Sequence, residues 1–271
     1  MLFFGFYATI FCSRLKNMDK NGNKILMGLD VSTACIGCAI IVDDGSKYGN
    51  VIELTHVSPK APKNVSGIET LFIKKDIFNE EFLAKWKDIG IDEVVIEEPL
   101  VRSNNVNTCA TLLRFNGMIS DCVYHELGVV PSYISSYDAR QYSFPELMSV
   151  RKYGKDENIY ARKKILKEIK SGQLVLFGAY PWNIDKKTVI QGKVSENLPD
   201  ITWIYNKNNE LKKENFDACD AYVAVLAHLN KQRNGELEFK ISDITENGDK
   251  VEYEVEYWGE KHHRTTYLPE E

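Results

Sequence analysis

The segment DEVVIEEPL, residues 92–100, most constrains the fold of this 271-residue chain. Its near-continuous apolar body indicates a short strand covered on both faces, because a half-exposed strand alternates apolar and polar residues. Glu97 and Glu98 end this strand, and a proline follows them. Burying a carboxylate is costly unless a partner compensates its charge. The segment therefore predicts a sheet between layers of helices, with acidic groups at the end of a buried strand.

Apolar periodicity predicts the other elements of an α/β fold. Branched, apolar runs bounded by turn signals predict strands at residues 24–31, 37–45, 51–57, 92–98 and 129–137. Apolar residues at helical spacing predict helices at residues 65–87, 107–128, 157–170, 186–196 and 216–232. Two alternating runs, residues 236–244 and 250–259, flank the hairpin signal TENGD. We expect an α/β fold with a mixed five-stranded sheet flanked by helices and a small C-terminal β-rich extension.

The chain is long enough for one large domain with an appendage. We expect an N-terminal extension at residues 1–23 that need not be native, because translation can start at Met18; its apolar run lacks the basic leader and the cleavage site of a signal peptide. The main domain is expected at residues 24–232, with an insertion at about 140–215, and an acidic β-rich tail at 233–271. No run approaches the roughly 18 apolar residues that cross a bilayer, so no membrane partner is expected. Six cysteines without zinc or disulfide spacing favour reduced thiols in the cytoplasm, or the host cytoplasm if the chain is viral.

The charge is unevenly distributed. The whole chain carries a formal net charge of −5, but residues 236–271 contain eleven acidic and four basic side chains, a net of −7. The remainder is therefore mildly basic, at +2, and residues 151–170 alone carry eight basic and three acidic side chains. Such a patch is compatible with binding phosphates. A solvated helix face with paired charges explains the segment equally well.

Four acidic residues fall at positions where they can meet. Asp30 ends the first strand and Glu97 ends the fourth, while Asp217 and Asp220 are spaced i,i+3 at the start of the last helix. The opposite face of this amphipathic helix is apolar and is expected to pack on the sheet. Four close carboxylates repel one another, and hard divalent cations such as Mg²⁺ relieve that repulsion. Each acid alone is more often a loop start or a helix cap, so the prediction depends on the four together.

These motifs resemble the RuvC family of Holliday-junction resolvases, within the ribonuclease H-like superfamily. ILMGLDVSTACIGCAII resembles the family's first hairpin, VVIEEPL the strand that ends in a metal-binding Glu, and DACDAYVAVLAH the closing D-x-x-D-A helix. The resemblance spans residues 24–232 and implies a ribonuclease H-like fold. It further implies that the catalytic residues are Asp30, Glu97, Asp217 and Asp220. These residues would also be the ligands of two Mg²⁺ ions, for which Mn²⁺ could substitute.

The resemblance also implies an activity and its partners. The chain would be a Mg²⁺-dependent crossover junction endodeoxyribonuclease, which resolves four-way junctions in branched DNA by phosphodiester hydrolysis during recombination and repair. Arg140, Lys186 and Lys187 are the candidates for DNA contacts near the scissile phosphate. Symmetric cutting of two strands calls for two active sites and therefore a homodimer, with the helix at 107–128 as the candidate interface.

Other interpretations remain open. The same acids would serve a nuclease that acts on other branched DNA or on RNA–DNA hybrids, and Val31, Glu98 and the long insertion depart from the family pattern. A non-catalytic DNA-binding scaffold with the same fold is a further alternative, although all four acids are present. A sugar-kinase or actin-like ATPase is disfavoured, because no second phosphate-binding hairpin is found.

Overall fold

The computed structural model describes residues 22–99, 105–149, 158–171, 175–176 and 185–268. The predicted N-terminal extension up to residue 21 and residues 151–157 of the basic patch lie outside the described residues. The chain divides into two compact units, the first made of residues 1–136 and 193–226 and the second of residues 137–192 and 227–271. Within the described ranges, no helix has the length and apolar character needed to span a membrane.

The first unit is built on a mixed five-stranded sheet in the order β3-β2-β1-β4-β5. Its strands are β1 (Ile25–Val31), β2 (Ile36–Val42), β3 (Asn50–Val57), β4 (Glu93–Glu97) and β5 (Ser132–Ile134). The first three strands pair antiparallel through short turns, and β4 and β5 add in parallel to β1. The expected fold class, a mixed five-stranded sheet flanked by helices with a separate C-terminal β-sheet, is confirmed.

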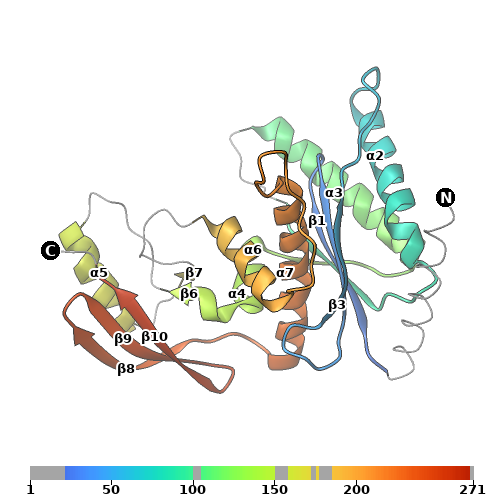
Figure 1. The fold of residues 1–271 in the computed structure, drawn as a ribbon. Helices are drawn as coiled ribbons and strands as arrows, with labels where there is room; N and C mark the ends of the chain where they lie inside the picture. The colour runs from blue at the N-terminus through green and yellow to red at the C-terminus, as the bar shows by residue number, and fades with distance from the viewer. Residues whose placement is uncertain (1–21, 100–104, 150–157, 172–174, 177–184, 269–271) are drawn as a thin grey trace. The chain divides into compact units, whose positions relative to one another are not determined.

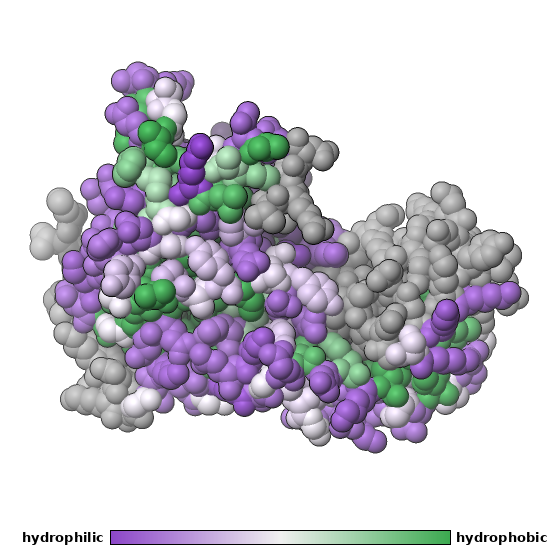
Figure 2. Space-filling view, turned by 180° about the vertical axis from the view of Figure 1, so that it is seen from behind, coloured by the Kyte–Doolittle hydropathy of each residue, from purple (hydrophilic) through white to green (hydrophobic). Residues whose placement is uncertain are grey.

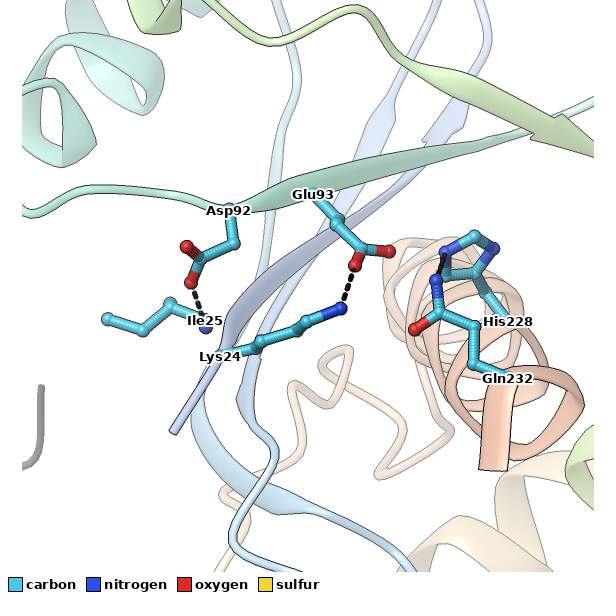
Figure 3. A network of polar contacts seen from close by, with 6 residues as sticks. All are labelled: Lys24, Ile25, Asp92, Glu93, His228 and Gln232. Atoms are coloured by element: carbon cyan, nitrogen blue, oxygen red, sulfur yellow. Dashed lines mark hydrogen bonds and ion pairs between the residues drawn. The ribbon is translucent and has the colours of Figure 1, made fainter. Parts of the chain in front are cut away.

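Polar contacts fix the register of β1 against β4 at the end where both strands begin. Lys24 Nζ lies 2.7 Å from Glu93 Oε1, and the backbone N–H of Ile25 donates to Asp92 Oδ2 at 2.7 Å (Figure 3). The two contacts tie neighbouring residues of one strand to neighbouring residues of the other. A shift of the register by one residue would break both contacts. The two contacts therefore also determine which residues of β1 and β4 are paired at the other end of the strands.

Helices cover both faces of the sheet (Figure 1). On one side lie α2 (Ile68–Glu81), the short 3₁₀ helix η1 (Leu83–Trp86) and α3 (Val106–Leu127). Because side chains alternate along a strand, every second residue of β1 packs against these helices. The members of this core from β1 and β4 are Ile25, Met27, Leu29, Val31, Val94 and Ile96. The intervening residues of both strands face the opposite side.

That opposite side is covered by α7 (Lys213–Asn234), as Figure 1 shows. A Cβ built on Gly28 of β1 would lie 2.2 Å from the carbonyl oxygen of Ala221 and 2.9 Å from the side chain of Val225. The helix therefore touches the strand backbone where the strand has no side chain. The prediction of packing against the sheet is confirmed, but the prediction of an amphipathic helix is wrong: every residue from Ala218 to Leu226 is buried. A helix that is buried around its whole circumference is a core helix, and this one carries the carboxylate of Asp220 into the core.

The second unit joins short helices to a three-stranded antiparallel sheet in the order β10-β9-β8. Besides the end of α7, its elements are α4 (Ser136–Ser143), η2 (Pro145–Leu147), β6 (Met148–Ser149), α5 (Asn158–Ser171), β7 (Val175–Leu176), the start of α6 (Lys186–Asn197), β8 (Lys240–Asn247), β9 (Lys250–Tyr257) and β10 (Glu260–Tyr267). The TENGD hairpin is confirmed between β8 and β9. The strand β10 was not predicted.

The C-terminal segment is fastened to α4 within this unit. The backbone N–H of Leu237 donates to the hydroxyl of Tyr142 at 3.2 Å, and that hydroxyl donates to Glu236. The guanidinium of Arg264 donates to the carbonyl oxygens of Glu146 and Pro145. Residues 236–267 are therefore an integral part of the second unit.

Several predicted elements differ from the structure in their bounds, and two of them show the physical reason. The helix expected at 65–87 is interrupted at Phe82, whose φ of −128° leaves the helical region, so that α2 ends and η1 follows. The strand expected at 129–137 shrinks to the three residues of β5, and the serine-rich stretch after it begins α4 instead. By contrast, the predicted end of α3 is confirmed at Gly128, which adopts φ 72° as a left-handed cap.

Candidate active site

Asp30 and Glu97 lie at the same end of two neighbouring parallel strands. Leu29 of β1 is paired with Ile96 of β4, and each acid is the next residue along its strand. Since Leu29 and Ile96 point into the core beneath α2 and α3, the alternation of the strands directs both acids to the face that α7 covers. The structure therefore brings these two predicted residues to one edge and one face of the sheet.

Asp217 reaches the same edge from α7. Gly37 of β2 is the antiparallel partner of Asp30, and a Cβ built on Gly37 would lie 1.9 Å from the carbonyl oxygen of Asp217. Only a residue without a side chain allows the first turns of α7 to come this close to the strand. The backbone of Asp217 consequently lies beside the strand pair that carries Asp30.

Asp220 is the most buried of the four acids, at 4% exposed. It follows Asp217 by three residues, a rise of about 4.5 Å along the helix. Its neighbour Ala221 rests on Gly28, two residues before Asp30 on β1. Burying a carboxylate in this way requires a cation or hydrogen-bond donors to offset the loss of hydration.

Cys35, in the turn between β1 and β2, contacts this site, although the sequence indicated no more for it than a reduced thiol. Burial raises the pKa of its thiol to about 12, and the charge of Asp217 together with a hydrogen bond to its carboxylate acts in the same direction. At neutral pH the thiol is therefore protonated and serves as a donor to Asp217. No residue spacing in the sequence signals this contact, because it joins a turn to a helix 182 residues later.

Hydrogen bonds from α2, from α3 and within the turn itself stabilise the turn that follows Asp30. The side-chain amide of Asn116 on α3 donates to the carbonyl oxygen of Val31, and Lys74 on α2 donates to that of Thr33. The hydroxyl of Ser32 donates to the carbonyl oxygen of Cys35 inside the turn. These contacts fix the end of β1 on the helices behind the sheet. A fixed strand end is what a precisely placed acid requires.

The donor set fits a hard divalent cation. The four acids offer only carboxylate oxygens, which are the protein ligands that Mg²⁺ prefers, and they come from three separate elements. As the side chains stand, no three His, Cys, Asp or Glu residues of the described ranges are grouped as metal ligands. The assignment of the four acids as metal ligands stays a prediction.

The predicted DNA-contacting residues belong to the other unit. Arg140 lies on α4, and Lys186 and Lys187 form the exposed first turn of α6. The carboxylate of Asp185 caps this turn by accepting from the backbone N–H groups of Lys187 and Thr188. All three basic residues fall within residues 137–192, whereas the four acids fall within the first unit. Their place beside a scissile phosphate stays a prediction.

No family model and no curated protein sequence matches the chain. Among solved structures, Thermus thermophilus RuvC is similar at 13% identity, covering 78% of this chain and 96% of that chain, with a TM-score of 0.45. T. thermophilus RuvC in complex with a Holliday junction substrate gives the same identity and coverage with a TM-score of 0.47. An Aquifex aeolicus PPX-GPPA enzyme is similar at 9% identity, covering 79% of this chain and 93% of that chain, with a TM-score of 0.35. At these TM-scores, none of the likenesses establishes an activity for this chain.

Proposed function

We propose that this chain is a Mg²⁺-dependent, structure-specific DNA endonuclease that resolves four-way junctions. The observation that carries the proposal is the convergence of three elements at one sheet edge. Asp30 and Glu97 end adjacent parallel strands and face α7, whose Asp217 abuts the strand partner of Asp30. Asp220 is buried one turn further along the same helix. The choice of a DNA junction as substrate rests on the resemblance of these motifs to RuvC resolvases.

The four carboxylates would hold two divalent ions, which when bound supply an activated water and stabilise the leaving oxygen of a phosphodiester. The protein residues position these carboxylates. Gly28 and Gly37 allow α7 to lie directly on the strands, and the thiol of Cys35 orients Asp217. Arg140 and the lysines at the start of α6 would offset the charge that develops on the phosphate.

A homodimer is part of the proposal, because two strands are cut symmetrically only by two sites. The predicted interface helix corresponds to α3, which exposes Leu113 and Tyr124. The neighbouring α2 exposes Ile68 and Phe72, and Figure 2 shows hydrophobic residues among hydrophilic ones on this part of the surface. Cytoplasmic location also belongs to the proposal, and the described cysteines, all buried and free of disulfides, fit a reducing compartment.

The test is cleavage of a labelled, mobile four-way junction with Mg²⁺, beside a linear duplex, a flap and an RNA–DNA hybrid. We expect paired symmetric nicks in the junction alone. Asp30→Asn should abolish cleavage while leaving junction binding equal or tighter, because it removes negative charge near the phosphates. Asp44→Asn is the matched control, since Asp44 is an exposed acid in a turn of the same sheet.

Three results would change the conclusion. Cutting of the flap or the hybrid in place of the junction would keep the acidic site and replace the substrate. Binding of the junction without cutting of any substrate would favour a non-catalytic scaffold. Full cleavage by a folded Asp30→Asn variant would refute the assignment of the site.

A further inference from the structure

The segment before α7 forms a small hairpin, which we call the 204–212 hairpin. Tyr205 and Leu211 form an antiparallel bridge, and the backbone N–H of Lys212 donates to the carbonyl oxygen of Ile204 at 3.0 Å. Figure 1 shows this segment, in orange-brown, at the start of α7. The sequence predicts no helix or strand for these residues, which fall within the expected insertion at about 140–215.

Its tip is organised by one side chain. The Oδ1 of Asn206 accepts from the backbone N–H groups of Asn208 and Glu210, at 2.8 and 3.0 Å. The Nδ2 of Asn206 donates to the carboxylate of Glu210 at 2.8 Å. Asn209 adopts φ 60°, a left-handed conformation that asparagine tolerates better than most residues. A tip fixed in this way loses little further conformational entropy when it binds a partner.

A buried asparagine ties the hairpin to the acidic site. Asn215 on α7 is 4% exposed, and its side-chain amide pairs with the backbone of Ile204 in both directions. Its Nδ2 donates to the carbonyl oxygen of Ile204 at 2.7 Å, and its Oδ1 accepts from the N–H of Ile204 at 3.0 Å. Asn215 precedes Asp217 by two residues. The base of the hairpin is therefore held within one helical turn of Asp217, although side chains two residues apart on a helix point to different sides.

The surface of the hairpin combines aromatic and basic groups. Tyr205 is 49% exposed, and the side chains of Lys207, Lys212 and Lys213 are exposed as well. Residues 203–213 contain three lysines and one glutamate. Exposed aromatic rings between lysines are typical of surfaces that bind unpaired nucleotides, since the rings stack on bases and the ammonium groups contact phosphates.

We propose that the 204–212 hairpin binds unpaired nucleotides at the branch of the DNA substrate, with Tyr205 stacked on a base and the lysines on the adjacent phosphates. This inference rests on the proposed function and assigns substrate recognition to residues beside the acidic site. By binding unpaired nucleotides, the 204–212 hairpin would place the branch of the DNA against the carboxylates. A continuous duplex, which has no unpaired nucleotides, would not be placed there.

The test measures binding by the full chain without divalent ions, so that no cleavage interferes. The probe is a four-way junction with 2-aminopurine at the branch, and a linear duplex of equal length is the reference. We expect Tyr205→Ala to weaken junction binding about 5- to 150-fold, the range for loss of one stacked base, and to abolish the 2-aminopurine signal of stacking. Tyr205→Phe should retain both. The double variant Lys207→Gln, Lys212→Gln should reduce the slope of log affinity against log salt by about 2.

Tyr267→Ala is the matched control, because Tyr267 is 53% exposed and lies on β10 of the acidic C-terminal sheet. It should bind the junction as the wild type does. A folded Tyr205→Ala variant with wild-type affinity and an unchanged 2-aminopurine signal would overturn the hairpin proposal alone. If the wild type neither binds nor cuts any branched DNA, the proposed function fails, and this inference fails with it.

Discussion

Replacing Gly37 by alanine tests whether α7 must lie directly on β2 for the acids to meet. The added Cβ would lie 1.9 Å from the carbonyl oxygen of Asp217, 2.3 Å from its carbonyl carbon and 2.9 Å from the backbone nitrogen of Ala218. All three are backbone atoms, so no change of rotamer relieves the contact. Ordinary van der Waals contacts of a Cβ atom begin at 3.4 Å. The start of α7 must therefore move away from β2 by the difference between 3.4 and 1.9 Å, about 1.5 Å.

Two effects of Gly37→Ala follow from this displacement. Overpacking of a filled core costs about 1–3 kcal/mol, and we expect a decrease of that size in the free energy of unfolding. Displacement of a catalytic group by about 1 Å costs on the order of 10²-fold in rate, and Asp217 and Asp220 both move with the helix. Urea denaturation measures the first effect. Junction cleavage with Mg²⁺, at a temperature where circular dichroism shows the variant to be folded, measures the second.

The matched control is Gly117→Ala. Gly117 is exposed on α3, and a Cβ there meets nothing within 4 Å. An alanine inside a helix should raise the free energy of unfolding by about 0.5–1 kcal/mol, so this variant is the control for the stability measurement. Wild-type stability together with wild-type cleavage in Gly37→Ala would refute the direct contact between α7 and the sheet, and with it the geometry on which the proposed site depends.

Two further predictions concern stability. The pKa of Cys35, raised from 9.0 to about 12 in the folded protein, means that only the unfolded chain loses this proton above pH 9. The free energy of unfolding should therefore fall as the pH rises from 9 towards 12, because the unfolded chain then loses a proton that the folded chain keeps. Urea titrations at pH 8 to 10.5 should show a flatter dependence for Cys35→Ala, and identical slopes would contradict the assignment. Tyr253→Phe removes the buried 2.9 Å hydrogen bond between the Tyr253 and Thr266 hydroxyls and should cost about 1–3 kcal/mol, which a thermal or urea melt of the full chain detects. An unchanged midpoint would mean that water replaces the bond.

Local patterns predicted the elements whose burial follows a simple period. The strands β1, β2 and β4 are buried apolar runs, and the i,i+3 spacing of Asp217 and Asp220 indicated their shared helical face. The strand β10 escaped prediction because EKHHRTTY has no apolar alternation; it exists through its pairing with β9, from Glu260↔Tyr257 to Tyr267↔Lys250. The burial of α7 on all sides was not predicted for a related reason. The sequence of the helix itself does not tell which other segments cover its outer side.

The placement of the acids, by contrast, could be predicted from the positions of the glycines together with those of the acids. Gly28 and Asp30 are two residues apart on β1 and therefore share a face. The first has no side chain and admits the backbone of Ala221, whereas the second carries the carboxylate. On β2, Gly37 repeats the arrangement by admitting Asp217 directly beside Asp30. A glycine that brings a helix onto a strand also brings the acids of that helix towards those of the strand, so close packing and the candidate site have the same cause.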